Sequence, residues 1–213
     1  LVIGSGPAGE SAALNAVKHG RTAAVIEDQP MVGGRCTHKG TIPSKALRHA
    51  VKQLMRFNSS KLFRNIGHGH RIPYPTVLSA AASVIERQVE MRSKFYRRNN
   101  VRVFEGRAAF VDTHTLQVTG NSGISSRVSG RDIVIATGSR PYHPPDIDFT
   151  HPRIYDSDTI LNLQHTPQKV LIYGAGVIGC EYASIFAGLG IKQFVPGAEG
   201  WSHGDDRRRQ RRE

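Results

Sequence analysis

The residues with the clearest chemical potential lie between Gly33 and Lys45, in the segment GGRCTHKGTIPSK of this 213-residue chain. This segment holds one thiol, Cys36, and ends on a lysine cation. A redox-active dithiol needs a second cysteine nearby, but the residue five positions after Cys36 is Thr41. A threonine hydroxyl cannot form a disulfide or carry electrons, so dithiol chemistry is excluded at these two positions.

Composition narrows the class of protein. Hydrophobic residues make up 38% of the chain and glycines number 22, which is typical of a globular α/β protein with many tight turns. Cys36 and Cys180 lie in separate motifs and predict no disulfide framework. We find neither a signal peptide nor an apolar run of about 18 residues, so we expect a soluble, cytoplasmic protein without a membrane partner. No metal site is predicted.

The formal charge of +12 raises the question of nucleic-acid binding. Basic residues gather between Arg92 and Arg98 and again between Arg207 and Arg212. The first group has apolar residues on the other side of a helical pattern, which favours a solvated helix face. We therefore expect no nucleic-acid partner.

Strand-like and helix-like segments alternate along the chain, as a doubly wound α/β fold requires. Strands are predicted at 1–3, 22–27, 101–105, 108–111, 115–118, 132–136 and 170–173, and helices at 9–19, 44–57, 76–99 and 179–188. An irregular linker is predicted from Pro144 to about His165. Two glycine-rich turns between a strand and a helix therefore fall in one chain.

The first of these turns reads GSGPAG and fits the pattern G-x-G-x-x-G. Gly4 permits the sharp turn, Gly6 lets the backbone approach a pyrophosphate, and Gly9 allows the helix to pack closely on the strand. The next predicted strand ends at Glu27, where a carboxylate should bind the adenosine ribose. This context favours a dinucleotide site over a turn whose glycines serve packing alone.

Residues 132–141 form an apolar strand that ends in Ala136-Thr137-Gly138. The segment resembles the second flavin fingerprint of flavoproteins with two dinucleotide domains. The alternative is a buried strand followed by a glycine turn.

The second glycine-rich turn, GAGVIG, spans Gly174 to Gly179 and predicts a second pyrophosphate at a second helix N-terminus. Two dinucleotide sites imply a bound flavin and a diffusing nicotinamide nucleotide. No strand is predicted after Gly190, so no ribose-selecting residue can be named for this site.

Four strings, at 33–49, 139–144, 151–158 and 173–186, together resemble the pyridine nucleotide-disulfide oxidoreductase family. The resemblance covers residues 1 to about 192. Thr41 replaces the second cysteine of the family's disulfide reductases, as in those members that exchange hydride between nicotinamide nucleotides. The resemblance thus implies FAD-dependent hydride transfer between NADPH and NAD⁺, in a ping-pong scheme through flavin N5.

The resemblance also implies the residues of the site. Lys45 and Glu181 are implied as the catalytic pair near flavin N5, and Cys36 as a contact without a catalytic role. FAD contacts are implied for Gly4, Gly6, Pro7, Ala8, Gly9, Glu27, Gly33, Gly34, Cys36, Thr37, Lys45, Ala108, Thr137 and Gly138. Contacts with NAD or NADP are implied for Gly174, Gly176, Val177 and Gly179.

The expected organisation has three parts. Residues 1–150 are predicted as an incomplete, doubly wound FAD-binding Rossmann-like domain, and 151–192 as the start of a second, NAD(P)-binding Rossmann-like domain. Residues 193–213 form an atypical basic tail, for which we hypothesise a reading-frame error after about Lys192. The family's dimer-forming region is not expected in this chain, although the parent protein is expected to be a homo-oligomer.

Three alternatives to a hydride-exchanging flavoenzyme stay open. A disulfide reductase of the dihydrolipoamide dehydrogenase type would be favoured by a second cysteine at position 41. A flavin-binding piece without turnover has the same motifs. A basic nucleic-acid binder is favoured by charge alone, and salt-dependent binding would reveal it.

Overall fold

A computed structural model describes residues 1–62 and 70–196 of the chain. The chain divides into two compact units, one formed by Leu1–Pro43 with Ala81–Leu161 and the other by Ser44–Ala80 with the residues from Asn162 on. Within the described ranges, no helix is both long and apolar enough to cross a membrane.

A parallel sheet forms the centre of the first unit. Its strands are β1 (Val2–Ile3), β2 (Ala24–Glu27), β3 (Arg102–Glu105) and β7 (Val134–Ile135), in the order β3-β2-β1-β7. Every neighbouring pair is parallel. Parallel neighbours need a crossover connection, and helix α1 (Pro7–Lys18) supplies the one between β1 and β2. The predicted α/β class is therefore confirmed.

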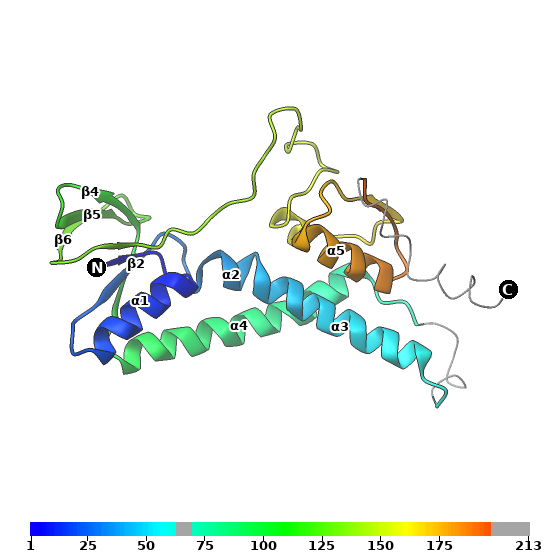
Figure 1. The fold of residues 1–213 in the computed structure, drawn as a ribbon, viewed down its shortest axis with the longest axis horizontal. Coiled ribbons are helices and arrows are strands. Elements are labelled where there is room, and N and C mark those ends of the chain that lie inside the picture. The colour runs from blue at the N-terminus through cyan, green and yellow to red at the C-terminus, as the bar shows by residue number, and fades with distance from the viewer. Residues whose placement is uncertain (63–69, 197–213) are drawn as a thin grey trace. The chain divides into compact units, whose positions relative to one another are not determined.

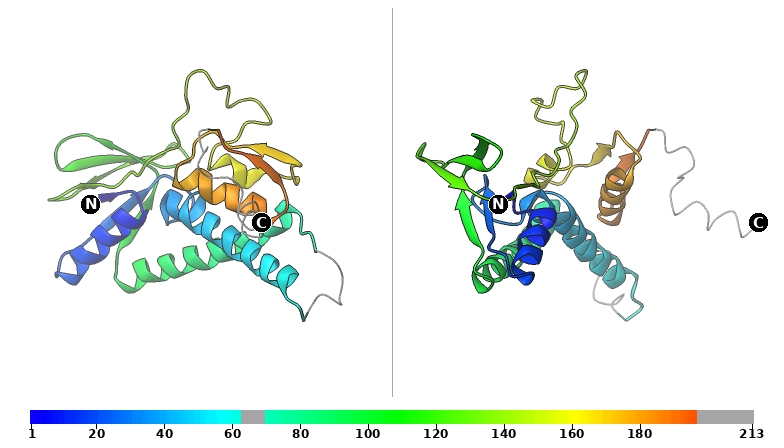
Figure 2. Two further views of the ribbon diagram at one scale, coloured as in Figure 1. Left: turned by 45° about the vertical axis from the view of Figure 1, so that its right-hand side comes forward. Right: turned by 60° about the vertical axis from the view of Figure 1, so that its left-hand side comes forward.

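Two layers cover the faces of this sheet, as Figures 1 and 2 show. On one face α1 and helix α4 (Tyr74–Arg98) pack through Ala13 and Tyr96 against Val25. On the other face, Ile26 packs against a three-stranded antiparallel sheet of β4 (Arg107–Phe110), β5 (Thr115–Thr119) and β6 (Ser125–Ser129). Successive strand residues point to opposite faces, so Val25 and Ile26 belong to separate cores.

The segment from Gly33 to Lys45 is more helical than predicted. A short helix α2 (Gly34–His38) precedes α3, which spans Thr41–Ser59 and so begins three residues before the expected start at Ser44. Pro43 lies in the first turn of α3, where a missing backbone N–H leaves no hydrogen bond unmade. Strand β6 was not predicted, because its sequence SSRVS has little apolar alternation and depends on pairing with β5.

The second unit contains the greater part of α3, helix α5 (Val177–Gly188) and two strands, β8 (Lys169–Leu171) and β9 (Lys192–Phe194). Its core includes Leu47 and Val51 of α3, with Tyr74 and Phe186 in ring contact at 5.4 Å between centroids. Figure 2 shows α5 in orange beside the strand that follows it. A 3₁₀ turn, η2 (Thr159–Asn162), falls within the predicted irregular linker.

Strand β9 corrects one prediction. The sequence predicted no strand after Gly190, yet Lys192–Phe194 pairs in parallel with β8, with Val170 opposite Gln193. The sequence of β9 lacks the apolar pattern that predicts a strand. The strand forms because the chain that follows α5 pairs with the edge of β8. The three-part division at 150 and 192 stays a prediction, and most of the basic tail, from 197 on, lies outside the described residues.

Candidate functional site

The first glycine-rich turn has the backbone that a dinucleotide loop needs. Gly4 has φ +103°, a left-handed conformation that side-chain-bearing residues rarely adopt. A Cβ on Gly9 would lie 1.9 Å from the Gly4 carbonyl oxygen, so only glycine lets α1 start this close to β1. At Gly6, the N-cap of α1, a Cβ would meet only the Gly34 Cα, at 4.0 Å. Gly9 is thus required by packing, whereas Gly6 faces open space.

Glu27 ends β2 beside this turn and is only 5% exposed. Its Oε2 accepts hydrogen bonds from the Ser5 backbone N–H at 2.9 Å and from the Ser5 hydroxyl. Its Oε1 accepts the backbone N–H of Gln29 at 3.0 Å.

Burial raises the pKa of the Tyr96 phenol above its usual range, and the carboxylates of Glu10 and Glu27 raise it further, so Tyr96 stays neutral.

The Gly33–Gly34 pair brings the start of α2 against the first turn. A Cβ on Gly34 would lie 2.8 Å from the Gly6 Cα, and one on Gly33 would lie 2.6 Å from the Thr37 Oγ1. Both glycines have positive φ, which is +115° at Gly33 and +58° at Gly34. Cys36 is a free, half-buried thiol one residue before Thr37.

The end of β7 meets the same turn from the other side. A Cβ on Gly4 would lie 2.4 Å from the Ala136 carbonyl oxygen and 3.5 Å from the Thr137 Cα. Gly138 follows with φ +70° and no atom in the way of a Cβ. Ala108 of β4 packs on the cluster around Ile26, next to Glu27 in β2. The two predicted flavin fingerprints are therefore neighbours in space.

The second glycine-rich turn repeats the geometry of the first. Gly174 has φ +117°, and a Cβ on Gly179 would lie 1.9 Å from the Gly174 carbonyl oxygen. Gly176, the N-cap of α5, has extended backbone and open space around its Cα, as Gly6 does. Val177 follows with 84% of its surface exposed. The same three glycine roles thus recur in the second unit.

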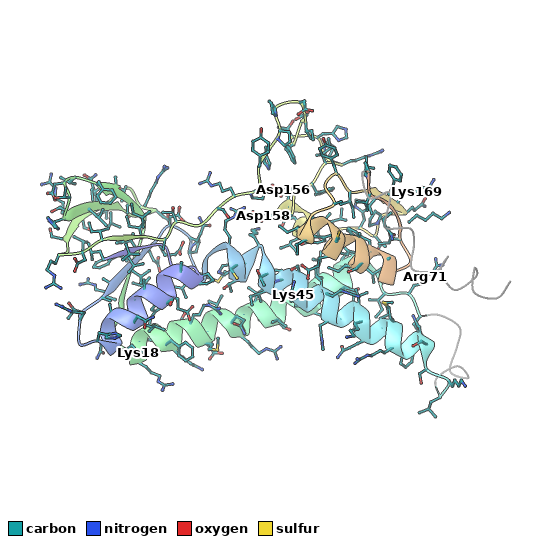
Figure 3. The ribbon with its side chains drawn as sticks, in the orientation of Figure 1. Lys18, Lys45, Arg71, Asp156, Asp158 and Lys169 are labelled. Carbon is teal, nitrogen blue, oxygen red and sulfur yellow. The ribbon has the colours of Figure 1, made fainter. Side chains whose placement is uncertain are left out.

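Lys45 and Glu181 are brought together in the second unit, from α3 and α5. The Lys45 Nζ lies 2.5 Å from Glu181 Oε1, and the buried Ser44 hydroxyl donates to Glu181 Oε2 at 3.0 Å. The Lys45 side chain is 62% exposed, whereas that of Glu181 is 15% exposed. Figure 3 labels Lys45 on α3. The cation is thus accessible while its carboxylate partner is largely covered.

These features fit a dinucleotide at the first turn. No side chain caps α1, so the backbone N–H groups of its first turn, around the exposed Pro7 and Ala8, are available to an anion. The Thr37 Oγ1 is buried without a hydrogen-bond partner among the described residues. A buried hydroxyl in that condition is costly unless a bound group satisfies it. No cluster of metal ligands occurs in the described part of the chain.

The comparisons with known proteins agree with this geometry. The profile of the family "Pyridine nucleotide-disulphide oxidoreductase" matches residues 1–196. The chain belongs to this family. Its turns and strands are therefore those of the pyridine nucleotide-disulphide oxidoreductases, whose FAD-binding domain the parallel sheet matches.

Two relatives within the pyridine nucleotide-disulphide oxidoreductases carry the same name, "Soluble pyridine nucleotide transhydrogenase". The protein from Marinobacter nauticus is 57% identical over 208 residues, and the one from Azotobacter vinelandii is 59% identical over 191 residues. These alignments cover 97% and 90% of this chain, but 45% and 41% of the relatives. The chain therefore spans less than half the length of the relatives it matches.

Two solved structures share the fold of this chain. The HOCl-induced flavoprotein disulfide reductase RclA from Escherichia coli has a TM-score of 0.76 at 30% identity, over 91% of this chain and 40% of that one. LpdA from Mycobacterium tuberculosis has a TM-score of 0.81 at 24% identity, over 91% of this chain and 43% of that one, and shows the fold alone.

Sequence reasoning missed several residues around the site. Ser5 and Ser44 hold the carboxylates of Glu27 and Glu181, but a serine between glycines or before a lysine carries no distinctive signal. Arg35, beside Cys36, forms an ion pair with Asp158, which Figure 3 labels in the segment after β7. A pair so distant in sequence cannot be predicted from spacing.

Proposed function

We propose that this chain is part of a flavoenzyme that transfers hydride between NADPH and NAD⁺ in ping-pong order, with FAD as its resident redox group. The observation that carries the proposal is Thr41, which stands where a dithiol reductase needs its second cysteine. The relatives named soluble pyridine nucleotide transhydrogenase support the same activity. Their names also support a cytoplasmic location, and a homo-oligomeric whole protein belongs to the same proposal.

Bound FAD would supply a hydride-accepting and hydride-donating centre that no amino-acid side chain provides. We assign the phosphates to the N-terminus of α1, with Gly6 and Gly34 leaving room for close approach. Glu27 would accept a hydrogen bond from the ribose hydroxyl. Thr37, Thr137 and Gly138 are assigned as further FAD contacts. The fit rests on the open Gly6 and the unsatisfied Thr37 hydroxyl.

We assign Lys45 and Glu181 to the reacting end of the flavin, on the strength of the family resemblance. Lys45 places a positive charge where negative charge develops, and such preorganised charge lowers a barrier more than a mobile one. Glu181 holds the Lys45 ammonium, and Ser44 in turn holds Glu181. Val177, exposed at the start of α5, is assigned to the nicotinamide nucleotide's site, together with Gly174, Gly176 and Gly179.

Residues 1–150 and 151–192 serve in this proposal as an FAD-binding domain and the start of an NAD(P)-binding domain. The repeated glycine geometry supports this division of labour. Gly4 and Gly174 share a left-handed φ, and a Cβ would clash with backbone at both Gly9 and Gly179. This shared geometry supports a dinucleotide site at both turns.

An anaerobic titration with NADPH tests the proposal. The purified chain is mixed with FAD, and its visible spectrum is followed as NADPH is added. We expect bound flavin to bleach without a long-wavelength thiolate–flavin band, and to regain its colour when NAD⁺ is then added. Bound flavin that NADPH cannot bleach would contradict the activity in this chain.

Gly6 offers a matched variant for the binding step. A methyl group at Gly6 meets no atom closer than 4.0 Å, so Gly6→Ala should fold normally yet block close approach of the phosphates. Gly120→Ala, at a glycine outside the site that lacks a left-handed φ and where a Cβ would meet no atom closer than 3.7 Å, serves as a control for FAD affinity. Equal FAD affinity in Gly6→Ala and the native chain would contradict the phosphate assignment.

A flavin-dependent disulfide reductase is the second candidate. The similarity to the disulfide reductase RclA favours it, although Thr41 opposes it. A charge-transfer band in the NADPH titration would indicate a reactive Cys36 thiolate and favour this candidate over hydride exchange.

A further inference from the structure

Ser5 lies at the meeting point of three separate parts of the candidate FAD site. It stands between Gly4 and Gly6 in the first turn, and its side chain is fully buried. Its hydroxyl accepts the backbone N–H of Gly33 at 2.8 Å and donates to Glu27 Oε2. One small side chain thus joins the first turn, the end of β2 and the start of α2.

The hydrogen bonds of Ser5 determine which oxygen of Glu27 is free for a ligand. A carboxylate oxygen has two acceptor lone pairs. The Ser5 N–H and hydroxyl both bind Oε2, so its acceptor capacity is used. Oε1 accepts only the Gln29 N–H among the described residues, at 3.0 Å, and keeps one lone pair. A ribose hydroxyl would therefore bind Oε1.

A hydroxyl at position 5 satisfies both neighbours because it is donor and acceptor at once. Alanine would leave the buried Gly33 N–H unpaired and remove one of the two hydrogen bonds that orient Oε2. The Glu27 carboxylate would then keep two hydrogen bonds in place of three and would be oriented less firmly. Cysteine would fill a similar volume but is a weak donor and a weak acceptor.

We propose that Ser5 is a positioning residue that orients Glu27 so that the site selects a dinucleotide whose adenosine ribose carries a free 2′-hydroxyl. The inference rests on the proposed FAD site and extends it to a residue with no expected role. Ser5 itself acts through Glu27 and through the Gly33 backbone.

The test compares two ligands, FAD and its 2′-deoxyadenosine analogue, by fluorescence-monitored titration of the 213-residue chain. We expect the native chain to prefer FAD, and Ser5→Ala to weaken FAD binding about 10-fold while binding the analogue with little change. Glu27→Gln should lose the same preference, and the double variant should lose no more than Glu27→Gln alone. Ser11→Ala, at an exposed serine of α1, is the control and should behave as the native chain.

Each outcome decides the inference. An unchanged preference in Ser5→Ala, or an equal loss of affinity for both ligands, would overturn it, because a general packing defect weakens both. Additive losses in the double variant would also overturn it. If Ser5→Ala does not fold, as circular dichroism would reveal, Ser5→Cys replaces it with the same expected loss of preference. A native chain that binds no FAD would instead overturn the proposed function, and this inference with it.

Discussion

At the scale of single residues, the ion pair of Lys45 and Glu181 is expected to contribute little to stability, and the proposed function gives it a role in the chemistry. The charged atoms lie 2.5 Å apart, but the Lys45 side chain is 62% exposed. Exposed ion pairs contribute only about 0–1 kcal/mol to folding because water competes for both charges. Removing the Lys45 charge should therefore change stability little, so that its proposed chemical role can be tested separately.

Lys45→Met removes that charge while keeping much of the side chain's length. We expect the free energy of unfolding to change by less than about 1 kcal/mol, whereas flavin reduction by NADPH should slow about 10-fold or more because a preorganised charge is lost. Stopped-flow absorbance measures the rate and urea unfolding the stability. Lys52→Met, at another exposed lysine of α3, is the control. An unchanged rate in Lys45→Met would show that the cation takes no part in the reaction.

Thr41 offers the complementary experiment, in which a thiol is added. The family's disulfide reductases have their second cysteine at this position, so Thr41→Cys should form a disulfide with Cys36 under oxidising conditions. Titration of free thiols should then find only Cys180 reactive in the oxidised variant, and all three thiols after reduction. Three reactive thiols before reduction would indicate that α2 and the start of α3 hold the two positions in the wrong geometry.

At the scale of elements, glycine decides how closely helices α3 and α5 pack. A Cβ on Gly188 would lie 2.3 Å from the Val51 Cγ1 and 2.9 Å from the Met55 Sδ. Val51 is fully buried and has no room to yield. Gly188 follows Glu181 on α5 by the same seven residues, nearly two turns, by which Val51 follows Ser44 on α3. This contact therefore sets the spacing at which Glu181 meets its partners.

Gly188→Ala should therefore destabilise the protein by about 1–3 kcal/mol, because overpacking forces the helices apart. The sign of this change in the free energy of unfolding is diagnostic, because Gly→Ala in an exposed helix interior stabilises by about 1 kcal/mol. Urea unfolding measures it, and Ala187→Ser at the exposed neighbouring position is the control. Gly188→Ala combined with Val51→Ala should show a favourable coupling energy, as the truncation makes room for the methyl group. A stabilised Gly188→Ala would mean that the helices are not in close contact there.

At the scale of the whole molecule, the two units differ in how well their sheets are covered. In the first unit Val25 and Ile26 are almost fully buried, between helices on one face and a second sheet on the other. Among the described residues of the second unit the sheet has two strands, β8 and β9, and Leu171 and Phe194 are 67% and 66% exposed. Two-stranded sheets are marginal in water unless something covers them.

Hydrogen exchange should reveal this difference. We expect the backbone amides of 169–194 to exchange at least about 10-fold faster than those of 1–27, because local opening costs less where few apolar contacts are lost. Mass spectrometry of peptides from the two ranges provides the measurement. Equal protection in both ranges would contradict the idea that the β8–β9 sheet is the weaker one.

The sequence by itself determined those features that depend on local backbone conformation and residue chemistry. The spacing of Gly4, Gly6 and Gly9 predicted the turn, because the left-handed φ of Gly4 and the close approach at Gly9 require glycine. Thr41 excluded a disulfide with Cys36 on residue type alone, because a hydroxyl cannot form one. Helix and strand periodicity was enough for the α/β class and for most elements.

Only the tertiary structure decided the features that depend on partners distant in the chain. Strand β9 exists because β8 offers an edge, and the polar residues of β6 form a strand because β5 pairs with them. Ser5 gains its importance from Glu27 and Gly33, which lie 22 and 28 positions away. Hydrogen bonds and packing across such separations are set by how the layers assemble, and no local pattern records them.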